Sequence, residues 1–138
     1  MERDVRSLIG FSLADIADGI PAAVFAYKDD PTEEIVFANG LCADLFGCAT
    51  VEEFLSYTGG SFRGVVVPSE LERVEASIRA QIEDGTGDRR DFVAYHIVRK
   101  DGRRLRVLDA GRLVNNEYYG SMFFVLLINA ELVEGWEA

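Results

Sequence analysis

The chain has 138 residues, of which 49% are hydrophobic, and its formal net charge is −10 at pH 7. This length suits one domain with a single core, and the acidic balance argues against binding to nucleic acid or to an anionic membrane, since both need clustered Lys and Arg. The longest apolar run is residues 122–128, far short of the about twenty residues that span a bilayer.

The N-terminus and the cysteines favour a cytoplasmic location. Residues 1–4 carry acids, and no signal-peptide core follows them. Cys42 and Cys48 form no CxxC pair, and His96 is the only histidine. We therefore expect reduced thiols, with neither a disulfide nor a zinc site.

The first predicted element is an amphipathic helix over residues 4–18. Apolar residues recur there at three- and four-residue steps, and Gly19 and Pro21 end the pattern. The stripe consists of Val5, Leu8, Ile9, Leu13 and Ile16. It needs a cover, which is either the body of the domain or a second copy of the chain.

Two strands and three helices are expected next. The predicted strands are at 22–28 and 34–38, and the helices are at 40–46, 51–57 and 69–84. Asp29-Asp30-Pro31 predicts a hairpin turn between the strands. Asn39 can cap the first helix, and Thr50 with Glu53 has the capping-box spacing for the second. The third helix is expected to start after Pro68, with Ser69 as its cap.

Three strands complete the chain, at 91–99, 104–114 and 119–128. Asp101-Gly102 predicts a tight hairpin between the first two, and Asn115-Asn116 predicts the second turn. The last strand is nearly all apolar, so we expect it to be central and covered on both faces. The pattern predicts an α+β domain, a five-stranded antiparallel sheet with helices on one face and an N-terminal amphipathic helix.

Four segments occur in an order that is typical of one family. They are residues 20–25, residues 35–39 followed by Leu45-Phe46-Gly47, Val67-Pro68-Ser69-Glu70 within 62–71, and residues 95–102. Together they resemble the signature segments of PAS domains, the input modules of bacterial sensor kinases and diguanylate cyclases. Two positions depart from the family pattern. Val67 stands where many members have His, and Ile128-Asn129-Ala130 stands where many have Asp-Ile-Thr.

This resemblance implies a division of the chain and a function. Residues 1–18 would form a dimerisation or capping helix, 19–131 the PAS domain, and 132–138 a C-terminal tail toward an output domain. The implied function is a regulatory module in signal transduction that dimerises and relays a signal to an effector. The expected partners are a second copy and a C-terminal kinase or cyclase domain in a longer parent chain.

The resemblance also identifies which cofactors to consider. Haem-binding members carry their proximal His on the long helix, and residues 69–84 contain none. Flavin-binding photosensory members carry a reactive Cys in a segment whose nearest equivalent here, residues 60–64, has none. We therefore expect no cofactor.

An apolar interior between the helices and the sheet is the candidate ligand pocket. Its expected lining is Phe25, Tyr27, Phe37, Leu41, Leu45, Phe46, Phe54, Phe62, Arg63, Val74, Ile78, Tyr95, Ile97, Phe124 and Leu126. A small apolar ligand would suit such a pocket. The alternative is that these residues fill a solid core.

A homodimer is expected through the N-terminal helix and the outer face of the sheet. Phe123, Val125 and Leu127 of the last strand are assigned to that outer face, beside the stripe of the helix. Exposed apolar surface of this extent usually marks an interface. A helix that only covers its own sheet is the alternative.

An alternative hypothesis is an enzyme whose active site contains His96, Asp109 and a tyrosine. Asp109 alternates with Leu105 and Val107, so it could point inward, and Arg112 is a simple alternative partner for it. Residues 59–64 have neither the nucleophile-elbow nor the P-loop spacing. We therefore expect no catalytic residues and no enzymatic activity.

Overall fold

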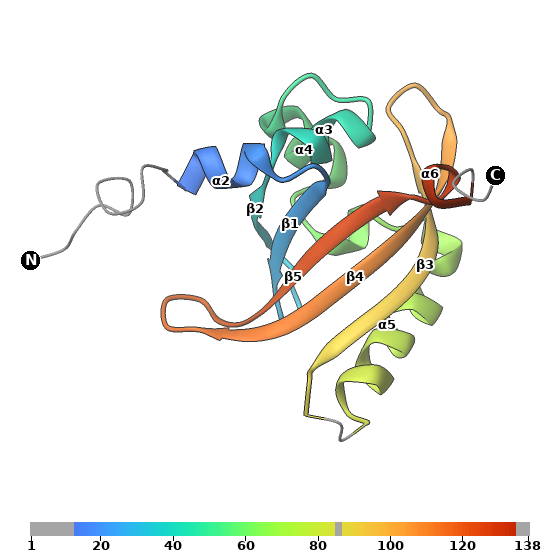
Figure 1. The fold of residues 1–138 in the computed structure, drawn as a ribbon. Helices are drawn as coiled ribbons and strands as arrows, with labels where there is room; N and C mark the ends of the chain where they lie inside the picture. The colour runs from blue at the N-terminus through green and yellow to red at the C-terminus, as the bar shows by residue number, and fades with distance from the viewer. Residues whose placement is uncertain (1–12, 85–86, 135–138) are drawn as a thin grey trace, which may run out of the picture.

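The computed structural model describes residues 13–84 and 87–134. Within these residues, six helical segments and five strands follow one another (Figure 1). They are α2 (Leu13–Gly19), β1 (Ala23–Lys28), β2 (Ile35–Ala38), α3 (Gly40–Leu45), α4 (Val51–Thr58), the 3-10 helix η1 (Phe62–Gly64), α5 (Pro68–Ile82), β3 (Arg90–Val98), β4 (Arg104–Asn116), β5 (Gly120–Asn129) and α6 (Ala130–Glu134).

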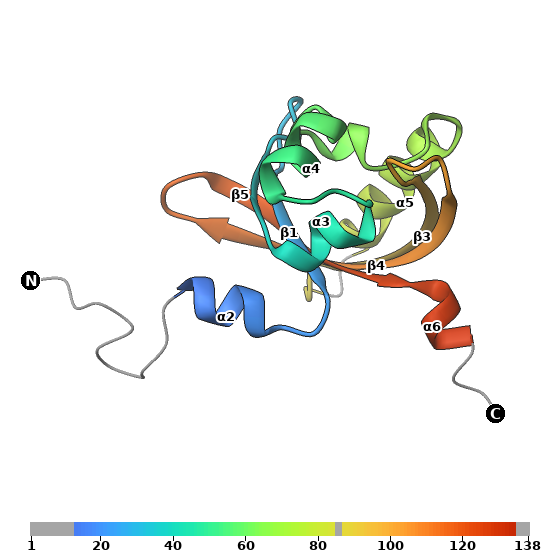
Figure 2. The same cartoon turned by 90° about the horizontal axis from the view of Figure 1, so that it is seen from above.

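The five strands form one antiparallel sheet in the order β2-β1-β5-β4-β3. The helices α3, α4 and α5 lie on one face of this sheet, as Figures 1 and 2 show from two directions. The prediction of an α+β domain with β5 at the centre is confirmed. In Figure 1 the helix α2 lies to one side and leaves the outer surfaces of β3, β4 and β5 uncovered.

A buried asparagine joins three segments near the start of the domain. The Oδ1 atom of Asn39 accepts hydrogen bonds from the Cys42 and Val24 amides at 3.1 and 2.9 Å. Its Nδ2 atom donates to the carbonyls of Ala17 and Ala22 at 3.1 and 2.9 Å. Asn39 therefore caps α3, as predicted, and also holds the end of α2 against the start of β1.

Side-chain caps begin α4 but not α5. Thr50 Oγ1 accepts from the Glu53 amide at 3.0 Å, and Glu53 Oε2 accepts from the Ala49 amide at 3.0 Å. This is the predicted capping box. The helix α5 starts one residue earlier than expected, with Val67 as N-cap and Pro68 in its first turn. Proline is favoured there because the first helical amide needs no partner.

The strand β3 is an edge of the sheet, and side chains of α5 take the place of a neighbouring strand. Gln81 bonds both backbone groups of Phe92 at 2.8 and 3.1 Å, Arg73 donates to the Ala94 carbonyl at 3.2 Å, and Glu70 accepts from the His96 amide at 2.6 Å. These contacts satisfy backbone groups that would otherwise invite another chain. They also explain why α5 lies alongside β3 in Figure 1, with the two running in opposite directions.

The C-terminal part differs from the prediction in two places. The strand β4 continues through Asn116, because Asn115 and Asn116 pair with Ser121 and Gly120 instead of forming the turn. Residues expected to be a plain tail form the short helix α6. Across 13–84 and 87–134, no helix combines the length and the apolarity that crossing a membrane requires.

Candidate functional site

Most of the residues predicted to line the pocket do lie between the helices and the sheet. The buried ones are Phe25, Tyr27, Phe46, Phe54, Phe62, Val74, Ile78, Tyr95 and Ile97, and Leu45 packs against them. Several aromatic rings are stacked. The ring centroid of Tyr27 lies 4.5 Å from that of Phe62 and 5.1 Å from that of Phe123. These rings fill much of the interior.

Five predicted pocket residues were placed wrongly. Phe37, Leu41 and Phe124 are 41%, 40% and 44% exposed. Arg63 is also exposed, and Leu126 is half-buried on the outer face of the sheet. The errors on β5 arise because a uniformly apolar strand has no alternation from which its two faces can be told apart.

The same error affects the predicted dimer interface. Phe123, Val125 and Leu127 are buried on the inner face of β5, among the core residues, and not on the outer face. Ile16 in α2 is exposed, and Leu13 begins that helix. Val5, Leu8 and Ile9 lie outside the described residues.

A polar centre lies inside this apolar core. The Tyr95 hydroxyl donates a hydrogen bond to Asp109 Oδ2 at 2.6 Å. Asp109 is 1% exposed, and its Oδ1 atom has no hydrogen-bond partner. Burial raises the pKa of Asp109 to about 8, and the nearby charge of Asp91 adds to this, while the Tyr95 hydrogen bond acts in the opposite direction.

Asp91 is the second acid of this centre. It is 5% exposed, and neither of its carboxyl oxygens has a partner. Burial raises the pKa of Asp91 to about 6. Its carboxyl group lies over Gly111 of β4, where a Cβ atom would come within 2.6 Å of Asp91 Oδ2. Asp91 was not among the predicted site residues, although it alternates with Val93, Tyr95 and Ile97, which all face inward.

Tyr27 links this centre to an acidic cavity. Burial raises the pKa of the Tyr27 hydroxyl far above its usual range, and the charges of Asp109, Asp91 and Glu33 contribute in that order. The adjacent cavity has a volume of about 110 Å³ and is lined by Tyr27, Lys28, Asp29, Glu33, Phe62, Glu75, Ile78, Arg79 and Phe123. Burial and the neighbouring Glu75 raise the pKa of Glu33 to about 8.

The geometry contradicts an active site built from His96 and Asp109. His96 points away from the core, and its Nδ1 atom lies 3.0 Å from Glu70 Oε2. Asp109 points into the core from the opposite face of the sheet, where its partner is Tyr95. Arg112 is exposed on the outer face and does not pair with Asp109. The inward orientation predicted for Asp109 is confirmed.

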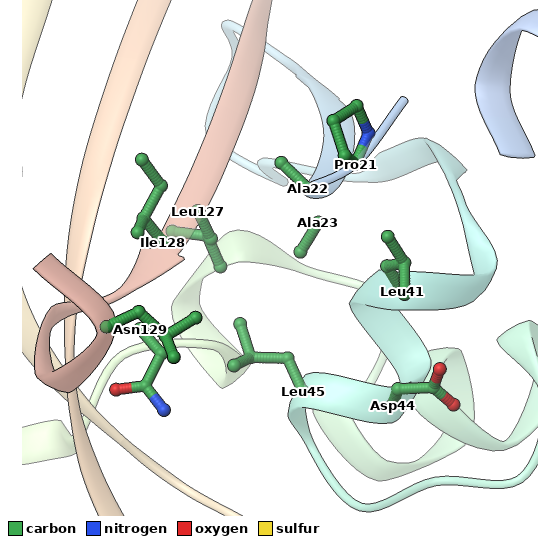
Figure 3. A pocket seen from close by; sticks show the side chains of 10 residues that line it. Pro21, Ala22, Ala23, Leu41, Asp44, Leu45, Leu127, Ile128 and Asn129 are labelled. Carbon is green, nitrogen blue, oxygen red and sulfur yellow. The ribbon is translucent and has the colours of Figure 1, made fainter. Parts of the chain in front are cut away.

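An apolar groove of about 320 Å³ opens between α3 and the end of β5 (Figure 3). Its lining is Pro21, Ala22, Ala23, Leu41, Asp44, Leu45, Leu127, Ile128, Asn129 and Leu132. Leu41, predicted to line the interior pocket, lines this groove instead, and Leu45 contacts both the core and the groove. The binding of a small apolar ligand stays a prediction.

The residues of β3, β4 and β5 that point to the outer face include four arginines and no acid. Two acids from outside these strands lie at its edge, with Asp88 Oδ2 at 3.6 Å from Arg90 Nε and Glu70 Oε2 at 3.0 Å from His96 Nδ1. The residues of the outer face are Arg90, Phe92, Ala94, His96, Val98, Arg104, Arg106, Leu108, Ala110, Arg112, Phe124, Leu126 and Ile128. The chain contains 24 acidic residues, yet the two acids of these strands, Asp91 and Asp109, both point inward. A shallow apolar hollow of about 260 Å³ lies on this face beside Phe124 and Leu126.

Similar proteins are found by structure and not by sequence. No family model matches the sequence, and no curated protein matches it. A light-oxygen-voltage receptor described as RNA-binding superposes with a TM-score of 0.69 at 21% identity, over 96% of this chain. A PAS domain from Burkholderia thailandensis, in complex with ethanol and part of a LuxR-family transcriptional regulator, superposes with a TM-score of 0.66 at 17% identity, over 88% of this chain and 99% of that one.

A PAS domain from Colwellia psychrerythraea gives a TM-score of 0.63 at 17% identity, over 85% of this chain and 94% of that one. The chain has the PAS fold. The fold expected from the four resembling segments is confirmed. The chain spans only 36% of the length of the RNA-binding receptor.

The interior of this PAS fold can be tested against flavin and haem. The cavity beside Tyr27, at about 110 Å³, is well below the roughly 300 Å³ at which ligand pockets begin, and its acids oppose a phosphate group. Cys42 is fully buried, and burial raises the pKa of its thiol to about 12. The helix α5 has no histidine that could bind a haem iron, and residues 60–64 contain no cysteine.

The end of the PAS fold has its own connection to α6. Asn129 Oδ1 accepts a hydrogen bond from the Glu131 amide at 3.0 Å, which starts the helix. An Arg103 nitrogen lies 3.4 Å from Glu131 Oε2, which ties α6 to the hairpin between β3 and β4. The stretch that departs from the family pattern, Ile128-Asn129-Ala130, therefore still supplies a side-chain acceptor at the exit from the sheet.

Proposed function

We propose that the chain is a sensory and regulatory PAS module that dimerises and relays a signal to an effector domain in signal transduction. The observation that carries this proposal is the outer face of β3, β4 and β5. On a chain with a net charge of −10, this face is apolar in the middle and bounded by arginines. Such a surface suits a partner with apolar and acidic side chains.

The arrangement of the outer face supports a specific kind of partner. Phe92 is 60% exposed, and it lies beside Ala110 between two charged ends. One end is the pair of Arg90 and Arg112, and the other is formed by His96 with Arg106. An amphipathic helix that carries acids can cover the apolar middle and approach the arginines at its two ends.

The chain itself supplies such a helix. The described helix α2 carries Asp15 and Asp18, has no basic residue, and exposes Ile16. Since α2 lies beside the sheet and leaves this face uncovered in Figure 1, we propose that it docks on the outer face of a second copy. Two such contacts related by a two-fold axis would close a dimer.

The relay is proposed to run through β5. This central strand places Phe123, Val125 and Leu127 in the interior and Phe124 and Leu126 on the outer face. It continues without a break into α6. A change in the interior would therefore act on both the dimer surface and the C-terminal exit, where an effector domain would be attached.

Light scattering tests the dimer. We expect the intact chain to be a dimer at micromolar concentrations, and a version lacking residues 1–17 to be a folded monomer by circular dichroism. Phe124→Ser should weaken the dimer, whereas Tyr118→Ser, at the 86% exposed tip of the β4–β5 hairpin, should leave it unchanged. A monomeric intact chain, or a truncated version that remains dimeric, would refute this part of the proposal.

A further inference from the structure

The two acids of the β3–β5 region form a buried pair. Register pairs Val93 with Asp109 and Asp91 with Gly111, so Asp91 and Asp109 are diagonal neighbours on the inner face. Such neighbours are about 7–8 Å apart along the backbone, and their side chains come closer. Three of their four carboxyl oxygens are buried and have no hydrogen-bond partner within residues 13–84 and 87–134. We call Asp91 and Asp109 the carboxyl pair.

We propose that the carboxyl pair is an interior proton-binding site, with the Tyr95 hydroxyl as its fixed donor, through which proton concentration regulates the outer face of β3 and β4. The proton site itself depends only on the interior geometry. The regulatory step deepens the proposed function, because it concerns the surface on which the second copy is proposed to dock.

A proton is the partner that the geometry favours. Buried acceptors without donors disfavour the charged form of a carboxyl group. A donor-bearing ligand or an ordered water would need space, and neither Asp91 nor Asp109 lines the acidic cavity, the apolar groove or the outer hollow. Protonation removes the charge without requiring any volume. Burial raises the pKa of both groups, to about 6 for Asp91 and about 8 for Asp109.

Among the described residues, the groups around the carboxyl pair do not supply a compensating cation. Tyr95 donates to Asp109 from β3, and the buried Tyr27 approaches from β1, where both acids raise its pKa. Cys42 of α3 lies next to Tyr95. The strand β5 contributes no titratable residue. Toward α5, charged groups line the cavity at Tyr27. Glu33 lies beside Glu75 there, and the Arg79 guanidinium forms an ion pair with Asp29 at 2.7 Å.

The position of the pair connects it to the outer face. Phe92 directly follows Asp91 in β3, and Ala110 directly follows Asp109 in β4. These two residues are paired across the strands on the outer side. When the pair loses a proton, the charge must draw in water or move away from the core, and either response shifts the backbone that displays Phe92 and Ala110.

Carbon-detected NMR of the intact, uniformly labelled chain tests this between pH 4 and 9. We expect the Asp91 and Asp109 carboxyl signals to titrate above pH 5, with Asp109 the higher, and the Phe92 and Ala110 amide shifts to follow the same midpoints. Asp91→Asn should lower the Asp109 midpoint, because it removes a neighbouring charge. Tyr95→Phe should raise it, because the hydrogen bond from Tyr95 favours the ionised form.

Dimer affinity over the same pH range supplies the second readout. It should change by about tenfold, a size typical of coupling between sites, and Asp109→Asn should abolish most of the change. The control Glu72→Gln, at an exposed position of α5 away from the outer face, should leave it intact. The inference is wrong if both carboxyl groups titrate with midpoints near the ordinary value of about 3.9. It is also wrong if their midpoints are raised but the Phe92 and Ala110 amide shifts do not follow them. A chain that is monomeric at every pH, but whose amides follow the raised midpoints, would support the inference and refute the dimer.

Discussion

The two faces of the strands β3, β4 and β5 carry opposite kinds of charge. Both acids of these strands, Asp91 and Asp109, lie on the inner face, whereas the four arginines Arg90, Arg104, Arg106 and Arg112 lie on the outer face. A surface built only for solubility would expose acids of this acidic chain on both its helices and its sheet. This difference is the basis of both proposals, the proton-binding carboxyl pair on the inner face and the docking surface on the outer face.

The largest expected effect compares neighbours on β5 that point in opposite directions. Phe123 is buried in the core and stacks on Tyr27, while Phe124 is 44% exposed on the outer face. Phe123→Ala should lower the free energy of unfolding by about 3–5 kcal/mol, because it leaves a cavity. Phe124→Ala should cost the monomer less than about 1 kcal/mol. Urea unfolding measures both, and equal losses would contradict the assignment of the two faces.

The second effect concerns the pH dependence of stability. The folded pKa of Asp109 is raised above its unfolded value, so the native state binds more protons between about pH 4 and 8, and stability falls as pH rises through this window. Asp109→Asn keeps an acceptor for Tyr95 and removes the charge. We expect the change in unfolding free energy caused by Asp109→Asn to be more favourable at pH 9 than at pH 4, by on the order of 3 kcal/mol.

Urea unfolding at pH 4 and pH 9 gives this difference directly. Asp88→Asn, which changes a solvent-exposed carboxylate, serves as the control and should show little pH-dependent gain. If Asp109→Asn is equally destabilising at both pH values, Asp109 is not a buried carboxyl group with a raised pKa.

A smaller effect is expected where the sheet makes room for Asp91. A Cβ atom at Gly111 would lie 2.6 Å from Asp91 Oδ2 and 2.9 Å from Oδ1. Gly111→Ala should destabilise the fold by about 1–3 kcal/mol through overpacking. The same substitution in an Asp91→Ala background should cost clearly less, since the clash is gone. Equal costs in the two backgrounds would show that Asp91 does not occupy this space.

The smallest effect tests the outer face. Arg112→Glu reverses one charge at the edge of the proposed docking surface and touches no core residue. We expect it to weaken the dimer by about tenfold, equivalent to about 1.4 kcal/mol, with unfolding of the monomer unchanged. Sedimentation equilibrium measures the dissociation constant. Lys100→Glu, which changes a cation in the β3–β4 turn away from this face, is the control.

Sequence patterns predicted those features that depend on neighbouring residues. Asp101-Gly102 marked the hairpin, Asn39 and Thr50 marked helix starts, and the alternation through Leu105 and Val107 predicted that Asp109 points inward. The faces of β5 could not be predicted, because seven consecutive apolar residues, 122–128, contain no alternation. The short helix α6 was missed, since five residues are too few to show a helical period.

The carboxyl pair could not be predicted from local sequence patterns, for a different reason. Asp91 alternates with Val93 and Tyr95, so its inward orientation was available from the sequence. Its meeting with Asp109 depends on the register between β3 and β4, which sets Asp91 opposite Gly111. The hydrogen bond from Tyr95 depends on the same register. A site made by cross-strand neighbours becomes visible only once that register is known.

Intermolecular paramagnetic relaxation tests most directly whether the outer face binds a second copy. A spin label on Ala110→Cys would lie in the middle of that face, and the native Cys42 and Cys48 are buried and should not react. In a mixture of spin-labelled chains with isotope-labelled, unmodified chains, we predict broadening of the Asp15 and Ile16 amides of α2. Broadening confined to other surfaces, or none at all, would contradict the account.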